Sequence, residues 1–267
     1  MTVWRELLSE ACERARKVAR RESSGGRRSI EVGTGAAGDK TLVVDRDAER
    51  GILDVLSEVP SLRILSEEKG QLGSRGARRV AVIDPIDGSS NFARGLPFYC
   101  TSIAIARGTT LKDVEHAIVM NLVNGEVYYA ERGKGATKNG EPIATSSRTK
   151  LSDSVMGIDL SRAGEPAISG LVPLISKIKK QVHLGANALE LCLLAEGKLE
   201  ATIDTRQMIR VTDVAAGYLI SREAGALVTT PRGGELTPAF DLKARFSYVA
   251  SANASIHDQI IESLRWK

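Results

Sequence analysis

The sequence predicts a layered protein of mixed α and β structure, in the α/β or α+β class. Before residue 150, two helical patterns are followed by consecutive strand-like runs with hairpin signals between them. After residue 150, strand-like and helical segments alternate, which is typical of helices packed against a sheet. No Pro-rich linker or internal repeat separates the parts. We therefore expect an N-terminal half, 1–150, and a C-terminal half, 151–267, that pack tightly against each other.

The first half begins with two helices and a loop. Apolar residues recur at three- and four-residue steps over 2–21, which predicts an amphipathic helix. Residues 22–39 are rich in glycine and serine, so we interpret them as a loop. A short extended segment, 41–45, ends at Asp45, and a second helix follows it and ends before Pro60.

The middle of the chain is dominated by strands. The strand-like runs are 62–65, 80–83, 101–106, 116–121 and 127–130. Asn124-Gly125 separates the last two runs, and Asn139-Gly140 follows them. Asn-Gly between apolar runs is a strong signal for a two-residue hairpin, because both residues tolerate positive φ. We therefore expect most of these strands to be antiparallel.

The second half alternates between the two kinds of element. We expect short strands at 154–160, 182–184, 199–204 and 226–230. We expect helices at 166–179, 187–196, 212–224 and 254–265. Gly197 and Gly225 directly follow two of these helices, and glycine in that position is a common helix stop. This alternation predicts that helices cover a second sheet.

Composition and charge exclude several classes of function. Hydrophobic residues make up 42% and charged residues 26% of the chain, as in ordinary globular proteins. The net charge of +4 is mild, and the basic residues between Arg14 and Arg28 are typical of the solvated face of a helix. No apolar run approaches the length of a membrane span, and the first residues lack a signal-peptide pattern. We therefore expect a cytoplasmic protein with no nucleic-acid partner and no membrane partner.

One stretch carries the strongest chemical signal, Arg79-Val-Ala-Val-Ile-Asp84-Pro-Ile-Asp87-Gly-Ser-Ser-Asn-Phe92. An apolar run leads into Asp84, and Asp87 and Gly88 follow shortly after it. A buried strand would bring both carboxylates and a tight turn to one point. Carboxylates beside a turn with free backbone N–H groups suit a hard cation that holds a phosphate.

Further acidic residues fall at the ends of expected elements. Glu67 and Glu68 follow one strand, Asp45 follows the extended segment, and Asp213 lies at the start of a helix. Each has an ordinary alternative, because such residues also form solvated corners and helix caps. Together with the two aspartates above, they predict an acidic wall at the carboxyl ends of strands, where α/β folds bind ligands.

Two competing motifs are rejected, and the histidines are given no catalytic role. Residues 33–38 spell Gly-x-Gly-x-x-Gly, but an extended segment follows where a dinucleotide site needs a helix. Asp84 and Asp87 are three residues apart, not two as in phosphatases of the haloacid-dehalogenase type, which argues against a phospho-aspartate. The three histidines are isolated in sequence, and we interpret them as packing or surface residues: His116, His183 and His257.

Three motifs together resemble the inositol monophosphatase superfamily. Asp84-Pro-Ile-Asp87-Gly-Ser-Ser-Asn-Phe92 is similar to its first signature, Thr212-Asp213-Val-Ala-Ala-Gly217 to its second, and Ser66-Glu67-Glu68 to its Glu-Glu element. They occur in the family's order across nearly the whole chain. Residues 203–213 resemble the archaeal branch, whose members often hydrolyse inositol monophosphate and fructose 1,6-bisphosphate. The resemblance implies an αβαβα sandwich of the sugar-phosphatase type and a homodimer.

The resemblance also implies roles for single residues. Two or three Mg²⁺ ions would be held by Glu67, Asp84, the carbonyl of Ile86, Asp87 and Asp213, with Asp45 assisting a third ion. The backbone N–H groups of Gly88 and Ser89 would hold the phosphate. The Ser89 hydroxyl and Glu67 would position a metal-bound water for in-line attack, and Asp87 would act in catalysis and substrate binding. At a helix N-terminus, the polyol would be met by Gly185, Ala186 and Asn187.

Elementary chemistry agrees with metal catalysis. The charge of a phosphate monoester repels nucleophiles, and metal ions neutralise that charge and supply hydroxide near neutral pH. Enzymes that hydrolyse such esters lower the barrier by on the order of 20 kcal/mol or more. One acid or base contributes roughly 10²–10⁴-fold, which is far too little. We therefore predict a Mg²⁺-dependent phosphomonoesterase that acts on a small-molecule phosphate ester.

Two residues depart from the family pattern. Thr212 replaces the usual tryptophan before the second-signature aspartate, which alters packing but not charge. Arg206 stands near the position of a glutamate that meets an inositol hydroxyl in animal members. An arginine fork binds phosphate oxygens in pairs, so Arg206 favours a bisphosphate or dual substrate, unless it pairs with Asp204 or Asp213 instead. Phosphatases of 3′-phosphoadenosine phosphate or histidinol phosphate, and a non-catalytic polyol-phosphate binding protein, stay as alternatives.

Overall fold

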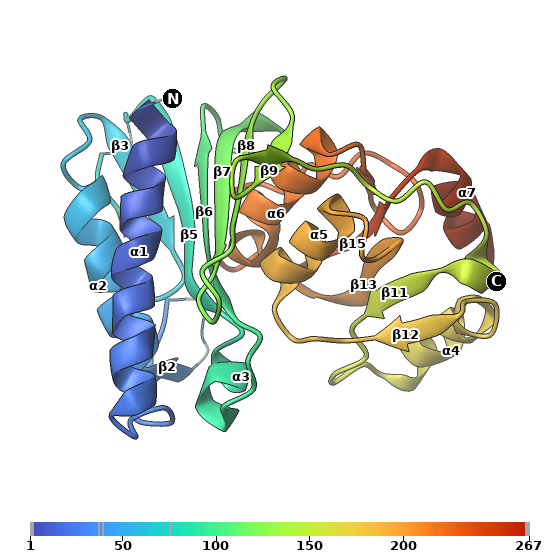
Figure 1. Cartoon of the computed structure of the whole chain (residues 1–267), viewed down its shortest axis with the longest axis horizontal. Helices are drawn as coiled ribbons and strands as arrows, with labels where there is room; N and C mark the ends of the chain where they lie inside the picture. Colours follow the sequence, from blue (N-terminus) through green and yellow to red (C-terminus); the bar gives the residue numbers. More distant parts are fainter. Residues whose placement is uncertain (1–2, 37, 39, 75, 265–267) are drawn as a thin grey trace.

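The computed structural model describes residues 3–36, 38, 40–74 and 76–264. The described chain forms five stacked layers in the order helices, sheet, helices, sheet, helices (Figure 1). This arrangement confirms the predicted αβαβα fold class. The helical layers are α1 (Val3–Ser24) with α2 (Val43–Leu56), α5 (Asn187–Ala195) with α6 (Val211–Glu223), and α4 (Glu165–Ile175) with α7 (Ala254–Ser263).

The larger sheet has eight strands, in the order β10-β9-β8-β7-β6-β5-β3-β4. All neighbours are antiparallel except β3 and β5, which run parallel. Both predicted hairpins form. Asn139-Gly140 is a two-residue turn between β9 and β10, whereas Asn124-Gly125 lies within the longer connection 122–126 between β7 and β8. The strands are β3 (Leu62–Ser66), β4 (Gly70–Leu72), β5 (Arg79–Asp87), β6 (Cys100–Ala106), β7 (Val114–Asn121), β8 (Val127–Glu131), β9 (Ala136–Lys138) and β10 (Glu141–Pro142).

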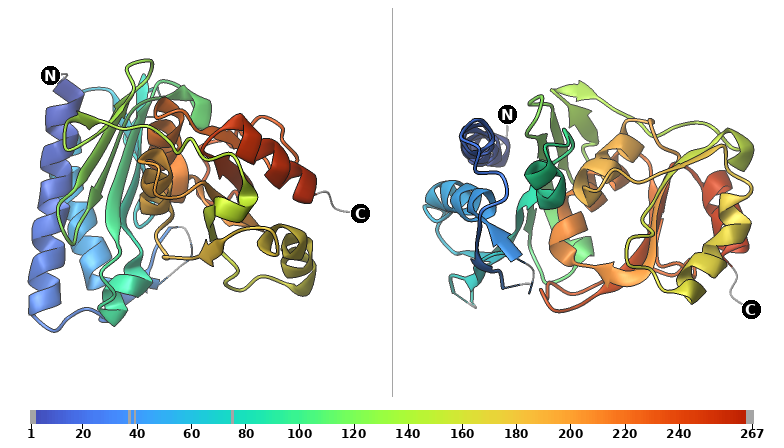
Figure 2. Two further views of the ribbon diagram at one scale, coloured as in Figure 1. Left: turned by 45° about the vertical axis from the view of Figure 1, so that its right-hand side comes forward. Right: turned by 90° about the horizontal axis from the view of Figure 1, so that it is seen from below.

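The smaller sheet has five strands, in the order β12-β11-β13-β15-β14. Strand β11 is parallel to both of its neighbours, whereas β15 is antiparallel to β13 and β14. Figure 2 shows that this sheet lies between the α5–α6 layer and the α4–α7 layer. The strands are β11 (Val155–Ile158), β12 (Lys180–Val182), β13 (Ala201–Ile209), β14 (Leu227–Thr229) and β15 (Phe246–Ser251).

Several elements differ from the sequence-based expectation. Residues 22–39 contain strand β1 (Glu31–Thr34), which pairs with β2 (Lys40–Leu42), so the loop prediction is wrong there. Asp45 lies inside the first turn of α2 and does not end a strand. The expected last helix reaches residue 265, which is outside the described residues. The elements that were not predicted are β4, α3 (Ser89–Arg94), β15 and the short 3₁₀ helices Leu111–Asp113 and Leu151–Asp153.

Strand β5 is covered on both faces, and this fixes the position of its acidic end. Val80 and Val82 pack into the core beneath α5 and α6, whereas Ala81 and Ile83 pack into the core beneath α1 and α2. Burying one such aliphatic side chain contributes about 1.5–3 kcal/mol. Since α5 and α6 follow residue 150 but cover the N-terminal sheet, the two expected halves are in close contact, and the boundary at 150 stays a prediction.

In the described part of the chain, none of the helices combines the length and the apolar character that crossing a membrane requires.

Candidate active site

A β-bulge turns two aspartates of β5 toward the same cleft. Asp84 lies opposite Ser102 and Asp87 lies opposite Cys100, so β5 has one residue more than β6 over this interval. Without that extra residue, side chains three positions apart would point to opposite faces of the sheet. The hydroxyl of Thr101 donates to the carbonyl of Pro85 within the bulge, at 2.7 Å. Strand β5 therefore extends through Asp87 rather than ending before Asp84.

Glu67 and Asp213 complete an acidic cluster around Asp84. Strands β3 and β5 are parallel with Ser66 opposite Ile83, so Glu67 and Asp84 leave the sheet side by side. Asp213 comes from the first turn of α6, a helix that packs on the same sheet. Single carboxylate oxygens of Glu67, Asp84 and Asp213 all lie within 4.8 Å of one another. With Asp87, these residues form what we call the carboxylate wall.

The carboxylate wall is short of positive charge. Burial, and then the neighbouring carboxylates, hold the pKa of Asp84 well above its ordinary value. Burial likewise raises the pKa of Glu67 to about 7 and the pKa of Asp87 to about 8. The Oδ1 atom of Asp84 is buried and has no hydrogen-bond partner. An unpartnered buried carboxylate oxygen between further carboxylates fits the oxygen ligand set of Mg²⁺.

The N-terminus of α5 holds Asp87. The backbone N–H groups of Asn187 and Ala188 donate to its carboxylate, at 3.2 and 2.7 Å. Gly185 and Asn187, which were predicted to meet the substrate, line the cleft. Ala186 is fully buried behind Gly88 and is not among the lining residues. The amides expected to face a substrate therefore also serve to fix a residue of the carboxylate wall.

Gly88 and Ser89 form the turn after β5. Gly88 has φ of 93°, and a Cβ on it would lie 3.0 Å from the carbonyl of Phe98, so glycine is needed for both reasons. The Ser89 Oγ lies 2.6 Å from Asp45 Oδ1 and 2.8 Å from the carbonyl oxygen of Ile86. Asp45 also accepts the N–H of Leu42 as a helix cap. Asp45 thus holds the Ser89 hydroxyl and itself lines the cleft.

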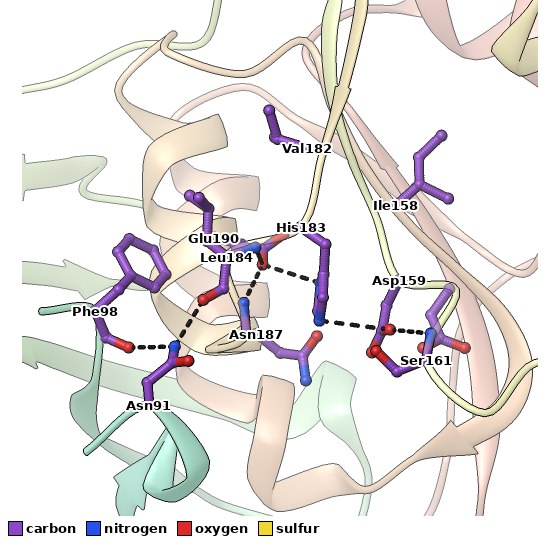
Figure 3. A network of polar contacts seen from close by, with 12 residues as sticks. Asn91, Phe98, Ile158, Asp159, Ser161, Val182, His183, Leu184, Asn187 and Glu190 are labelled. Carbon is purple, nitrogen blue, oxygen red and sulfur yellow. Dashed lines mark hydrogen bonds and ion pairs between the residues drawn. The ribbon is translucent and has the colours of Figure 1, made fainter. Parts of the chain in front are cut away.

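The opposite side of the cleft consists of charges that are paired with one another. We call Asp159, His183 and Arg206, backed by Glu190 and Asp204, the paired wall. Figure 3 shows His183 between two carboxylates, 3.4 Å from Asp159 and 3.5 Å from Glu190. Glu190 also accepts the N–H groups of residues 184 and 185. The hydrogen bond to Glu190 contributes most to raising the pKa of His183 above its ordinary value.

The guanidinium of Arg206 is engaged within the paired wall. Its Nε donates to Asp204 at 2.9 Å, its Nη2 contacts Asp204 and Asp159 at 2.5 Å, and its Nη1 donates to the carbonyl of Ser161. Only 6% of the Arg206 side chain is exposed. The alternative of a pair between Arg206 and Asp204 is therefore confirmed. This pair lies in the wall of the cleft, and the contacts of Arg206 given above do not include Asp213.

The two walls enclose a cleft of about 950 Å³. The described residues that line it include Asp45, Glu67, Asp84, Ile86, Asp87, Gly88, Ser89, Gly185, Asn187, Arg206 and Asp213. The sequence interpretation missed Arg210 and Asp159, and it placed His183 among packing or surface residues although His183 lines the cleft. Two signals were available: Asp159 lies at the end of an expected strand, and Arg210 directly precedes the helix that carries Asp213.

The layered fold and the carboxylate-lined cleft define a phosphatase. A model of the inositol monophosphatase family matches residues 1–266, and the chain belongs to this family. This match confirms the family membership that three sequence motifs predicted.

Individual relatives agree with this assignment. The chain is 35% identical over 241 residues to the fructose-1,6-bisphosphatase/inositol-1-monophosphatase of Methanothermobacter thermautotrophicus, with 86% of this chain and 85% of the relative covered. It is 33% identical to the bifunctional NADP phosphatase/NAD kinase of Methanococcus maripaludis, but covers 45% of that protein. The crystal structure of the MJ0109 gene product, an inositol monophosphatase–fructose 1,6-bisphosphatase, superposes with a TM-score of 0.87 at 28% identity, covering 98% of this chain and 100% of that one.

Proposed function

We propose that this chain is a Mg²⁺-dependent phosphomonoesterase that acts on inositol monophosphate, fructose 1,6-bisphosphate or both. The observation that carries the proposal is the convergence of Glu67, Asp84 and Asp213 within 4.8 Å around a buried, unpartnered carboxylate oxygen. Two or three ions would be held by Glu67, Asp84, the carbonyl of Ile86, Asp87 and Asp213, with Asp45 nearby. When bound, Mg²⁺ neutralises phosphate charge and lowers the pKa of water.

The chain's own groups have separate tasks in this reaction. Gly88 and Ser89 stand at the start of a short helix and line the cleft, and their backbone N–H groups would hold the phosphate oxygens. Because Ser89 Oγ directs its proton toward Asp45 or the Ile86 carbonyl, its lone pairs can accept a hydrogen bond from the attacking water. Glu67 would take up the proton that this water releases, the ester P–O bond breaks, and the departing alcohol oxygen takes a proton from solvent water in the cleft. These contacts hold the water and the ester in line.

The substrate's organic part meets the paired wall. Gly185 and Asn187 offer polar groups of the chain to polyol hydroxyls, and Asp159 offers carboxylate oxygens. Because Arg206 is already held by Asp204 and Asp159, its guanidinium is less available to bind a second phosphate than the sequence predicted. A bisphosphate substrate is favoured instead by two exposed arginines that line the same cleft: Arg162 and Arg245.

Phosphate release tests this proposal directly. The purified chain is incubated with inositol 1-phosphate and with fructose 1,6-bisphosphate, with Mg²⁺ or with a chelator. NADP, 3′-phosphoadenosine phosphate and histidinol phosphate complete the panel. We expect release from at least one of the first two esters, and loss of release with chelator. Tight binding of these esters without any release would favour a polyol-phosphate binding protein, and release that survives the chelator would refute the metal mechanism.

The homodimer and the cytoplasmic location belong to the same proposal. They are supported by the resemblance to the family and by the composition, respectively. Light scattering of the purified chain would distinguish a dimer from a monomer.

A further inference from the structure

One arginine lies directly against the carboxylate wall. The Nη1 atom of Arg210 lies 2.8 Å from Glu67 Oε1, and its Nε lies 3.2 Å from Asp213 Oδ1. The backbone N–H of Arg210 donates to the other oxygen of Asp213, at 3.0 Å. The guanidinium therefore bridges two carboxylates that come from different layers, one after β3 and one on α6. Its side chain is only 16% exposed, so the contact is shielded from solvent.

This bridge neutralises the wall only in part. A single guanidinium charge faces Glu67 and Asp213, and the buried Oδ1 of Asp84 stays without a partner. The distances of 2.8 and 3.2 Å between Arg210 and the carboxylate oxygens are ordinary for N–H···O hydrogen bonds. Mg²⁺ binds its oxygens at about 2.0–2.1 Å. An ion that used the same oxygens of Glu67 and Asp213 would bring a second, larger positive charge against the guanidinium, and the two cannot share those oxygens at low cost.

We propose that Arg210 is an internal competitor for the metal. Without an ion it bridges Glu67 and Asp213 and preserves the shape of the site, and it is displaced from at least one of them when Mg²⁺ binds. The inference rests on the proposed function, because it takes these carboxylates as metal ligands. Metal binding must then break the ion pairs of Arg210, so the observed affinity is lower than the carboxylates alone would give.

The sign of a change in metal affinity tests the proposal. Mg²⁺ binding to the full chain is measured by titration calorimetry for the wild type and for Arg210→Gln, and the melting temperature is measured with and without Mg²⁺. We expect the Kd for Mg²⁺ to fall about tenfold in Arg210→Gln. We also expect a lower melting temperature without metal and a larger increase on adding Mg²⁺, because the bound ion replaces the lost bridge.

Two matched variants separate competition from simpler effects. Arg245→Gln removes a positive charge from the same cleft, where Arg245 Nη1 donates to the carbonyls of Leu242 and Ala244. Arg148→Gln removes an arginine–carboxylate pair elsewhere, 2.9 Å from the buried Glu200. We expect either variant to change the Kd for Mg²⁺ by less than about twofold. A tightening in Arg245→Gln equal to that in Arg210→Gln would reduce the effect to general charge and overturn the proposal.

The remaining outcomes are also decisive. Weaker or unchanged Mg²⁺ binding in Arg210→Gln would mean that Arg210 only orients Asp213, and the proposal would fail. If Arg210→Gln does not fold, Arg210→Lys takes its place, since a single ammonium cannot bridge both carboxylates as a fork does. Binding by Arg210→Lys that is not tighter than wild type would also overturn it. A wild-type chain that binds no Mg²⁺ would instead remove the proposed function.

Discussion

The two sides of the cleft carry similar residues but differ in how far their carboxylates are paired with cations. The carboxylate wall places Glu67, Asp84 and Asp87 in a buried position where each pKa is raised, because burial is not balanced by enough positive charge. In the paired wall, Asp159 meets both His183 and Arg206, so its negative charge is compensated on two sides. The first side is therefore built to take up cations, and the second is already complete without a ligand.

This difference distinguishes a side suited to catalysis from a side suited to recognition of the substrate. A folded protein tolerates uncompensated buried charge only where the rest of the structure holds it in place, and such strain marks functional sites. The β-bulge before Asp87, the α5 amides and the Arg210 bridge supply that support. The paired wall needs no such support, so its residues are better placed to shape the substrate's organic part than to promote hydrolysis.

Removing one carboxylate should therefore abolish activity without loss of stability. For Asp84→Asn we expect a fall in kcat/KM on the order of 10³-fold or more, because a single lost electrostatic group already costs ~10²–10³. Without metal, the variant should melt at or above the wild-type temperature, since a buried charge next to other carboxylates has been removed. Phosphate release and thermal melting measure the two effects. Activity within tenfold of wild type would contradict the assignment of Asp84. Asp213→Asn should lose activity in the same way, but it also breaks the ion pair with Arg210 and so should not gain stability.

The paired wall should respond in the opposite way. Arg206→Gln leaves the buried Asp204 and the nearby Asp159 without their shared partner. Breaking a buried ion pair on one side destabilises a protein by about 3–5 kcal/mol. We expect a loss of this size in denaturant unfolding, together with a smaller loss of activity than in Asp84→Asn. A stability equal to wild type would show that the carboxylates of this wall do not depend on Arg206.

A milder effect is expected at the exposed arginines of the cleft. Arg162→Gln and Arg245→Gln should raise KM for fructose 1,6-bisphosphate a few-fold, because exposed ion pairs contribute up to ~1 kcal/mol. KM for inositol 1-phosphate should stay within twofold, since this ester has no second phosphate. Steady-state kinetics with both esters provide the comparison. Equal changes for both substrates would remove these residues from the recognition of a second phosphate.

The carboxylate wall was largely predictable, and the paired wall was not. Glu67 and Asp84 could be placed together because each follows an expected strand, and α/β folds bind ligands at the carboxyl ends of strands. The bulge that turns Asp87 to the same side depends on pairing with β6, which periodicity within β5 cannot reveal. In the paired wall, the partners of Asp159 lie 24 and 47 residues further along the chain, as the numbers of His183 and Arg206 show. Such contacts leave no local pattern in a single sequence.

Local signals also failed where tertiary contacts decided the outcome. Strand β1 forms in the glycine-rich stretch because it pairs with β2. Its Val32 and Thr34 favour a strand, but a strand of four residues gives too weak a signal among the surrounding glycines and serines. Arg206 was interpreted from its chemistry as a phosphate ligand, but Asp159, which competes for the same fork, belongs to another strand end. The nearby partner Asp204 was among the predicted alternatives, whereas the distant partner Asp159 was not.

The smallest effect is expected for His183, and it depends on pH. The charged groups that face His183 are Asp159 on one side, Glu190 on the other, and Arg206 beyond Asp159. Because its pKa is raised in the folded state, protonated His183 adds stability that is fully present below the unfolded pKa of about 6.5. This contribution is lost as the pH rises through the folded pKa.

The comparison of wild type with His183→Gln isolates this contribution. The free energy of unfolding of both proteins is measured at pH 5.5 and at pH 8.5, and the difference between them is taken at each pH. The other titrating carboxylates of the cleft cancel in this difference, because both proteins contain them. We expect His183→Gln to cost up to ~1 kcal/mol at pH 5.5, as for a partly exposed ion pair, and less at pH 8.5. A difference that is the same at both pH values, or larger at pH 8.5, would mean that His183 pairs with neither carboxylate as a cation and that the paired wall is closed by Arg206 alone.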